Sequence, residues 1–150
     1  MTSTKNQDQA AQKAYELSKK KPKKATAFPR SAGVLLHPTS LPSRHGIGDV
    51  GAGARAFVDW LQAAGCQRWQ ILPLVPVGGG WSPYASLSSL AGNPMLIDLD
   101  DLVARGALAP IDVEPGSSFH QDKVDWHRVV EWKSAILQRA CDRLASTSAG

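Results

Sequence analysis

The residues best suited to chemistry lie in one glycine-rich loop. Three consecutive glycines at positions 78–80 permit close backbone approach, and Trp81 and Tyr84 follow with flat apolar faces that carry a polar edge. Such faces stack on sugar rings, while Ser82, Ser86 and Asn93 supply groups that bond sugar hydroxyls. The loop therefore favours a carbohydrate site. The alternative is an aromatic-capped loop with a purely structural role.

The same glycines invite comparison with phosphate-binding loops. The sequence has no Gly-Lys-Ser or Gly-Lys-Thr ending after them, and no predicted helix opens directly on the loop. The cradle of backbone N–H groups that binds phosphate is therefore not supplied. A phosphate site is disfavoured.

Two other groups of polar residues have both a structural and a functional interpretation. His37 ends a short apolar run, where barrel enzymes place reactive groups, and it can bond a substrate hydroxyl or, more commonly, the adjacent loop backbone. Asp98, Asp100 and Asp101 suggest a metal or acid–base cluster, but their place at a helix start favours capping. We assign no catalytic residue and no metal ligand, and we keep His37 among the substrate-binding candidates.

The elements that position this loop are predicted from the spacing of apolar residues. The apolar run 31–36 predicts a buried strand, and residues 68–74 predict a second one. Between them a helix of about three and a half turns begins at Ala52, with Gly65 as its C-cap glycine. Strand, helix and strand form a βαβ unit with parallel strands, so the fold class is α/β. The helix residues expected to face inward are Ala52, Ala56, Phe57, Trp60, Leu61 and Ala64.

The second half of the chain predicts two more helices. A short helix follows Ile97, with Asp98 or Asp100 as N-cap and Gly106 as terminator. Residues 109–118 are expected to form an acidic linker, and a longer helix follows over 123–145. The residues interpreted as core are Leu99, Leu102, Val103, Trp126 and Trp132.

Composition indicates a soluble globular protein of about one domain. The 150 residues are 43% hydrophobic and 20% charged, and no apolar run is long enough to span a membrane. The Lys- and Gln-rich start does not resemble a secretory signal, which favours a cytoplasmic location. Cys66 and Cys141 are far apart and lack metal-ligand spacing, so we interpret both as ordinary thiols.

The positive charge is concentrated in one tract. The net charge is +4, and five lysines lie within residues 19–24. Residues 1–27 contain little apolar surface, so a disordered basic tail is favoured over binding to nucleic acid or to a membrane. An interaction protein that acts through this tail stays open as a lower-ranked alternative.

A family resemblance is carried by several motifs. Residues 33–42, Gly-Val-Leu-Leu-His-Pro-Thr-Ser-Leu-Pro, followed by Gly-Ile-Gly-Asp at 46–49, resemble the opening strand and loop of amylomaltases, which are 4-α-glucanotransferases. Ser-Pro-Tyr at 82–84 and Ala-Gly-Asn-Pro at 91–94 resemble further family segments at the same spacing. Residues 65–73 resemble the second-strand motif of the wider α-amylase superfamily.

This resemblance runs strongly over residues 28–108 and weakly from there to the end. It implies a (β/α)₈ TIM barrel without a cofactor, and an enzyme that transfers α-1,4-glucan segments between maltooligosaccharides, or starch- or glycogen-derived glucans, by a retaining double displacement. Tyr84 corresponds to the tyrosine that stacks on the sugar beside the scissile bond, and Ser82 to a neighbouring contact. The chain departs from the family pattern at Gly79 and Trp81, where members commonly carry Tyr and Asp or Asn.

The resemblance also implies that this chain is incomplete. The family's catalytic carboxylates lie on later barrel strands, and a barrel needs on the order of 200 residues or more. We therefore expect residues 28–150 to be an N-terminal fragment of the barrel, with 109–150 the start of a helical insertion. The isolated chain is predicted to be poorly stable and without transferase activity. A non-catalytic maltooligosaccharide-binding fragment is the alternative.

Overall fold

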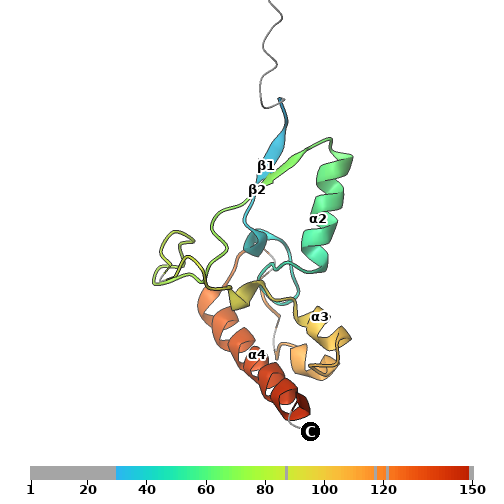
Figure 1. The fold of residues 1–150 in the computed structure, drawn as a ribbon, viewed down its shortest axis with the longest axis vertical. Coiled ribbons are helices and arrows are strands. Elements are labelled where there is room, and N and C mark those ends of the chain that lie inside the picture. Colours follow the sequence, from blue (N-terminus) through green and yellow to red (C-terminus); the bar gives the residue numbers. More distant parts are fainter. Residues whose placement is uncertain (1–29, 87, 117, 121, 149–150) are drawn as a thin grey trace, which may run out of the picture. The chain divides into compact units, whose positions relative to one another are not determined.

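The computed structural model describes residues 30–148, except positions 87, 117 and 121. The expected basic tail over residues 1–27 lies outside the described residues. Within them, strands and α-helices alternate with short 3₁₀ helices, and helices make up most of the second half (Figure 1). In chain order the elements are β1 (Gly33–Leu35), η1 (Pro38–Ser40), α2 (Ala52–Ala63), β2 (Arg68–Gln70), η2 (Pro94–Leu96), α3 (Leu99–Ala104), η3 (Pro110–Val113) and α4 (Trp126–Ser148).

The two strands form the expected parallel pair. β1 lies beside β2 with Val34 opposite Trp69, and α2 connects them. Gly65, with φ +71°, follows the last turn of α2 in the left-handed conformation that favours glycine, as expected for a helix end. The α/β class and the βαβ unit are therefore confirmed.

The strands are shorter and less buried than predicted. Each has three residues, and only the middle ones, Val34 and Trp69, are half-buried. The prediction of buried strands over 31–36 and 68–74 is wrong at their ends. A parallel strand is buried only when neighbours cover both of its sides and both faces, and this sheet has two strands among the described residues. Pro73 and Pro76 also lack the N–H that a longer ladder would need.

The inward face of α2 is narrower than predicted. Ala54 and Leu61 are buried, and Phe57 is half-buried against Trp69, with ring centroids 4.9 Å apart. Trp60 was expected to face inward, but it is 55% exposed and stacks on Phe57 along the helix surface. The predicted inward positions Ala52, Ala56 and Ala64 are exposed as well. Apolar periodicity predicts which residues share a helix face, but it does not predict how much of that face the two short strands cover.

The hydrophobic core lies around α4, away from the strands. One cluster joins α4 to α3 and η3, and a second joins it to η2 and the loop after η1. Residues 109–118 were predicted to be only a linker, but Val113 at the end of η3 is fully buried. Phe119, which follows η3 in the chain, is also buried, because it packs against the apolar stripe of α4. The buried members of the two clusters are Leu99, Ala107, Leu108, Val113, Ile136 and Ala140, and Ile47, Met95, Phe119 and Val129.

The Asp98 carboxylate joins the starts of two helices. Its Oδ1 accepts a hydrogen bond from the Asp100 N–H at 2.9 Å and caps α3, while Oδ2 accepts from the Ala52 N–H at 3.3 Å at the start of α2. A Cβ at Gly51 would lie 1.7 Å from Oδ2, so only glycine leaves room for this carboxylate. Gly106, with φ +75°, follows α3, as predicted.

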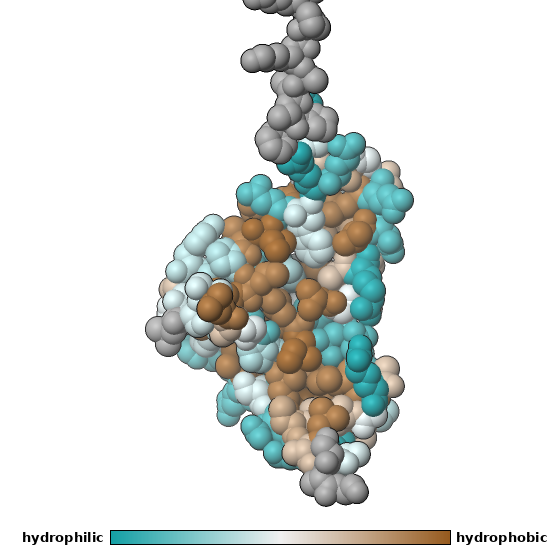
Figure 2. Space-filling model, viewed as in Figure 1, coloured by the Kyte–Doolittle hydropathy of each residue, from teal (hydrophilic) through white to brown (hydrophobic). Residues whose placement is uncertain are grey.

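Exposed apolar side chains gather on one face of the described chain, which extends from the strand pair toward α4 (Figure 2). Leu35 at the end of β1 is 55% exposed, and Ile71 just after β2 is 43% exposed. Among the described helices, none is both long enough and apolar enough to cross a membrane. Cys66 and Cys141 are free thiols, as predicted.

Candidate functional site

The glycine-rich loop is closed on itself by backbone hydrogen bonds. The Gly78 N–H donates to the Ala85 carbonyl at 2.7 Å, the Trp81 N–H to the Gly78 carbonyl at 3.3 Å, and the Ala85 N–H to the Ser82 carbonyl at 3.0 Å. A Cβ at Gly78 would lie 2.4 Å from the Ala85 oxygen, so the closing contact requires glycine there. Residues 78–85, called the 78–85 loop below, thus form two successive turns with joined ends.

Trp81 occupies a strained position in this loop. Its φ is +58°, a conformation that costs an L-residue roughly 1–2 kcal/mol, and it follows Gly80 at φ +82°. The indole stacks on Trp126 of α4, with ring centroids 5.6 Å apart and planes 9° from parallel, and forms a T-shaped pair with the His127 ring at a centroid distance of 5.2 Å. Aromatic pairs of this kind contribute about 0.5–1.5 kcal/mol beyond burial. The stack therefore offsets much of the strain.

Tyr84 is the aromatic residue of the loop that faces solvent. It is 73% exposed, and its backbone N–H donates to the Ser82 hydroxyl oxygen at 3.3 Å. The Ser82 hydroxyl accepts that bond and can still donate its own hydrogen. An exposed phenol beside a hydroxyl donor is an arrangement that a sugar ring and its hydroxyls can use.

The Asn93 side chain makes hydrogen bonds to the backbone of two segments. Its Oδ1 accepts from the Met95 N–H at 3.0 Å and caps η2, and its Nδ2 donates to the Val75 carbonyl at 3.3 Å. The residue is buried. Asn93 therefore ties η2 to the segment that leads into the 78–85 loop.

His37 also has protein partners at both ring nitrogens. Nδ1 accepts from the Thr39 N–H at 3.3 Å and lies 2.6 Å from the Thr39 hydroxyl, and Nε2 lies 3.3 Å from the Pro73 carbonyl. Because Nδ1 accepts from the Thr39 N–H, the hydrogen that faces the Pro73 carbonyl is on Nε2. The imidazole thus joins the segments that follow β1 and β2.

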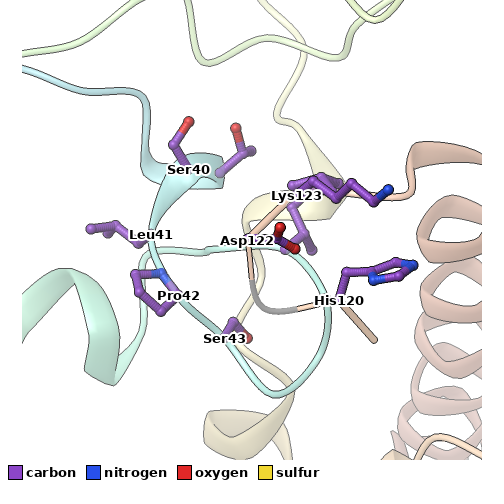
Figure 3. A pocket seen from close by; sticks show the side chains of 11 residues that line it. Ser40, Leu41, Pro42, Ser43, His120, Asp122 and Lys123 are labelled. Atoms are coloured by element: carbon purple, nitrogen blue, oxygen red, sulfur yellow. The ribbon is translucent and has the colours of Figure 1, made fainter. Parts of the chain in front are cut away.

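A cavity of roughly 200 Å³ lies between the segment 39–47 and the segment around His120 (Figure 3). Its polar side chains do not converge on one point: Ser40 points away from Ser43, and His120 and Lys123 extend toward α4. This cavity contains none of the loop aromatics. It therefore does not extend the candidate sugar site.

A buried lysine connects α4 to η2. Lys133 is fully buried, and its ammonium donates to the Met95 carbonyl at 2.8 Å and lies 3.9 Å from Asp49 Oδ2. Burial lowers the pKa of Lys133 to about 8, against the attraction of the nearby carboxylate. Burial likewise raises the pKa of Asp49, although the Gly51 N–H donates to this carboxylate.

The acidic residues near α3 are engaged in structural contacts. Asp98 caps α3, which confirms the capping interpretation for that residue. Arg44 donates to Asp100 at 2.6 Å and lowers the pKa of that carboxyl, and Arg55 lies 3.4 Å from Asp101. In the part of the chain that the structure describes, no three His, Cys, Asp or Glu side chains are placed to bind a metal ion.

His45 is the one described residue with a buried side-chain nitrogen that lacks a hydrogen-bond partner. Its Nε2 lies 4.0 Å from the Asp100 carboxylate, and its ring packs 5.8 Å from that of Trp132. Burial is the main reason why its pKa is lowered.

Sequence reasoning missed the contacts that α4 makes with this region. Trp126 packs against the second core cluster, as predicted, but its stack on the loop residue Trp81 was not predicted, and neither was the buried hydrogen bond of Lys133. A signal was present: Lys133 falls between Val129 and Ile136 on the apolar stripe of α4. A lysine in such a stripe needs a buried acceptor, although the sequence does not reveal which one.

A parallel βαβ unit with an aromatic, glycine-rich loop after its second strand defines an α/β protein, a class in which ligand sites commonly lie beyond the carboxyl ends of the strands. The chain belongs to the 4-alpha-glucanotransferase family, whose sequence profile matches residues 36–150. The expected family is confirmed.

Two curated relatives and one solved structure illustrate the similarity. The chain is 50% identical over 111 residues to the 4-alpha-glucanotransferase of Synechocystis and 49% identical over 113 residues to that of Thermus thermophilus. These matches cover 74% and 75% of this chain and 22% of each relative. The amylomaltase from Streptococcus agalactiae in complex with acarbose matches with a TM-score of 0.73 and 42% identity, over 79% of this chain and 24% of that one. The chain thus spans about a fifth of the length of the curated relatives.

Proposed function

We propose that this chain supplies one wall of the glucan-binding cleft of a 4-α-glucanotransferase, with Tyr84 stacking on a sugar ring and Ser82 donating to a sugar hydroxyl. The observation that carries the proposal is the exposure of the Tyr84 ring on a loop whose backbone is closed and supported. The solved relative carries acarbose, which favours a saccharide ligand.

The complete enzyme would transfer α-1,4-glucan segments between maltooligosaccharides by a retaining double displacement. One carboxylate would attack the anomeric carbon, a second would protonate the leaving oxygen, and an acceptor sugar would resolve the covalent intermediate. We assign neither carboxylate to this chain, because the family resemblance places both on later barrel strands. The described acids near α3 cap helices or pair with arginines. Binding without turnover is the alternative for the chain alone.

The strand pair would be the start of a (β/α)₈ barrel. The exposed Leu35 and Ile71 support this proposal, because further strands packed beside β1 and β2 would cover them. The two clusters around α4 contain no residue of either strand, which supports residues 109–150 as the start of a helical insertion outside the barrel.

The other three candidates would contribute in different ways. Trp81 is half-buried and would offer a sugar only the part of its ring that Trp126 leaves free. Asn93 and His37 would act mainly by supporting the segments around the 78–85 loop, because their amide and ring nitrogens already have protein partners.

Calorimetry with maltoheptaose tests the assignment of Tyr84. We expect Tyr84→Ala to weaken binding about tenfold, equivalent to about 1.4 kcal/mol, because the stacking face is removed. Tyr84→Phe should retain most of the affinity, and Leu90→Ala, at a fully solvated apolar side chain, serves as the matched control. Equal affinity of Tyr84→Ala and Leu90→Ala would exclude Tyr84 as a sugar contact. Disproportionation of maltotriose by the chain alone would show that our assignment of the catalytic groups is wrong.

A further inference from the structure

One helix contacts the candidate site at two points. Trp126, the first residue of α4, stacks on Trp81 in the 78–85 loop, and Lys133 donates to the Met95 carbonyl in η2. Figure 1 shows the loop segment and η2 beside the first turns of α4. Neither helix residue is required by the proposed sugar contacts themselves.

The first contact acts on a strained residue. Trp81 is the one residue other than glycine with positive φ among the described residues, and such outliers persist only where their surroundings fix them. Its neighbours Ser82 and Tyr84 form the next turn of the same loop. The backbone conformation of Trp81 therefore sets the orientation of the following turn, and with it the direction of the Tyr84 side chain.

The second contact reaches the loop from its other side. Lys133 bonds the carbonyl of Met95, and the N–H of Met95 is bonded by Asn93. Asn93 in turn donates to the carbonyl of Val75, which precedes Gly78 by three residues. A series of hydrogen bonds therefore links α4, through η2, to Val75, three residues before the loop.

The two contacts belong to one face of a rigid element. Trp126 and Lys133 are seven residues apart, about two helical turns, so they project from the same side of α4. Because the same face also carries the buried Val129 and Ile136, α4 cannot rotate without disturbing the core.

We infer that Trp126 and Lys133 are positioning residues, through which α4 fixes the 78–85 loop and the direction of the Tyr84 ring. Neither residue needs to touch the sugar. The effect on glucan affinity rests on the proposed function, but the effect on the loop does not.

Amide hydrogen exchange of the full chain tests the positioning role directly. The amides to follow are those of Gly78 and Ala85, which close the loop, with Ala64 at the end of α2 as a remote reference. In Trp126→Ala and Lys133→Met we expect protection of the loop amides to fall at least tenfold while that of Ala64 stays unchanged. Ser134→Ala, at an exposed position of the same helix, is the matched control and should change neither.

Two spectroscopic and binding measurements complete the test. The stacked indoles should give an exciton signal in far-ultraviolet circular dichroism that Trp126→Ala abolishes. Should this variant fail to fold, Trp81→Gly removes the same stack at a positive φ that glycine adopts freely. Maltoheptaose affinity should fall about fivefold in both positioning variants, with Tyr84 intact.

The outcomes are distinguishable. Loop amides as protected in Trp126→Ala and Lys133→Met as in Ser134→Ala would overturn the inference. Loss of protection at Ala64 together with the loop would also overturn it, because that result indicates general destabilisation. If the wild-type chain does not bind maltoheptaose, the proposed function fails, while the exchange data still decide the role of α4.

Discussion

Replacement of Asp98 by alanine should destabilise two helices at once. The buried carboxylate accepts one hydrogen bond at the start of α3 and one at the start of α2, at 2.9 Å and 3.3 Å. Loss of an N-cap costs about 1 kcal/mol, and loss of the second, partly buried hydrogen bond at the start of α2 costs about 1–2 kcal/mol more. We therefore expect Asp98→Ala to lower the free energy of unfolding by about 2–3 kcal/mol.

The neighbouring Asp101 provides a matched control. It lies in the same helix, but its carboxylate is partly exposed and pairs only with the exposed Arg55 at 3.4 Å. Exposed ion pairs contribute about 0–1 kcal/mol, so Asp101→Ala should have a small effect. Asp98→Asn retains one acceptor oxygen and should fall between the two.

Urea unfolding followed by tryptophan fluorescence measures these differences as shifts of the midpoint at constant slope. The reasoning also predicts that protection of amides in the first turns of α2 and α3 falls together in Asp98→Ala. A free energy of unfolding for Asp98→Ala within about 0.5 kcal/mol of that for Asp101→Ala would refute the shared cap.

Two further predictions concern a glycine and a lysine. Gly48→Ala should destabilise the chain by about 3 kcal/mol, because its Cβ would lie 2.1 Å from the Pro38 carbonyl oxygen, and backbone cannot move aside as a side chain can. Gly53→Ala in α2, where the nearest atom is 3.4 Å away, should instead stabilise by about 0.5–1 kcal/mol, and thermal unfolding of the pair checks both. The free energy of unfolding should rise by up to about 3 kcal/mol between pH 8 and pH 10.5, because the lowered pKa of Lys133 lets the folded chain release a proton that the unfolded chain retains. Lys133→Met should lack this rise in urea titrations across that range, and parallel curves for the two proteins would contradict the assignment.

The elements predicted correctly from the sequence are those specified by local chemistry. The change from a short apolar run to helical spacing identified the βαβ unit, and Asp98 and Gly106 marked the ends of α3. Caps depend on residues within one turn of the helix, so the sequence alone contains the necessary information.

The incorrect predictions concern the burial of side chains by distant parts of the chain. Trp60 was assigned inward because it shares a helical face with Leu61, but the two short strands do not extend over it. Val113 was assigned to a linker because its neighbours are proline, glycine and acids, yet the stripe of α4 buries it. Both outcomes depend on partners that lie far away along the chain.

In the candidate site, too, local features could be predicted from the sequence, whereas contacts between distant segments could not. Glycines and aromatics identified the loop, and the exposure of Tyr84 agrees with a ligand-facing role that stays a prediction. The stack of Trp81 on Trp126 could not be predicted, because it depends on a left-handed backbone at Trp81 and on the docking of α4. The Lys133 contact also arises only once η2 lies against that helix.

The dependence of the core on α4 has a consequence for folding during synthesis. The ribosome releases residues 31–125 before the helix that buries Ile47, Leu99 and Val113 has emerged. Until then these side chains have no helix to cover them, and the nascent segment exposes its apolar surface to chaperones. We therefore expect full protease resistance of the nascent chain to appear only after Val129, Ile136 and Ala140 of α4 have left the exit tunnel.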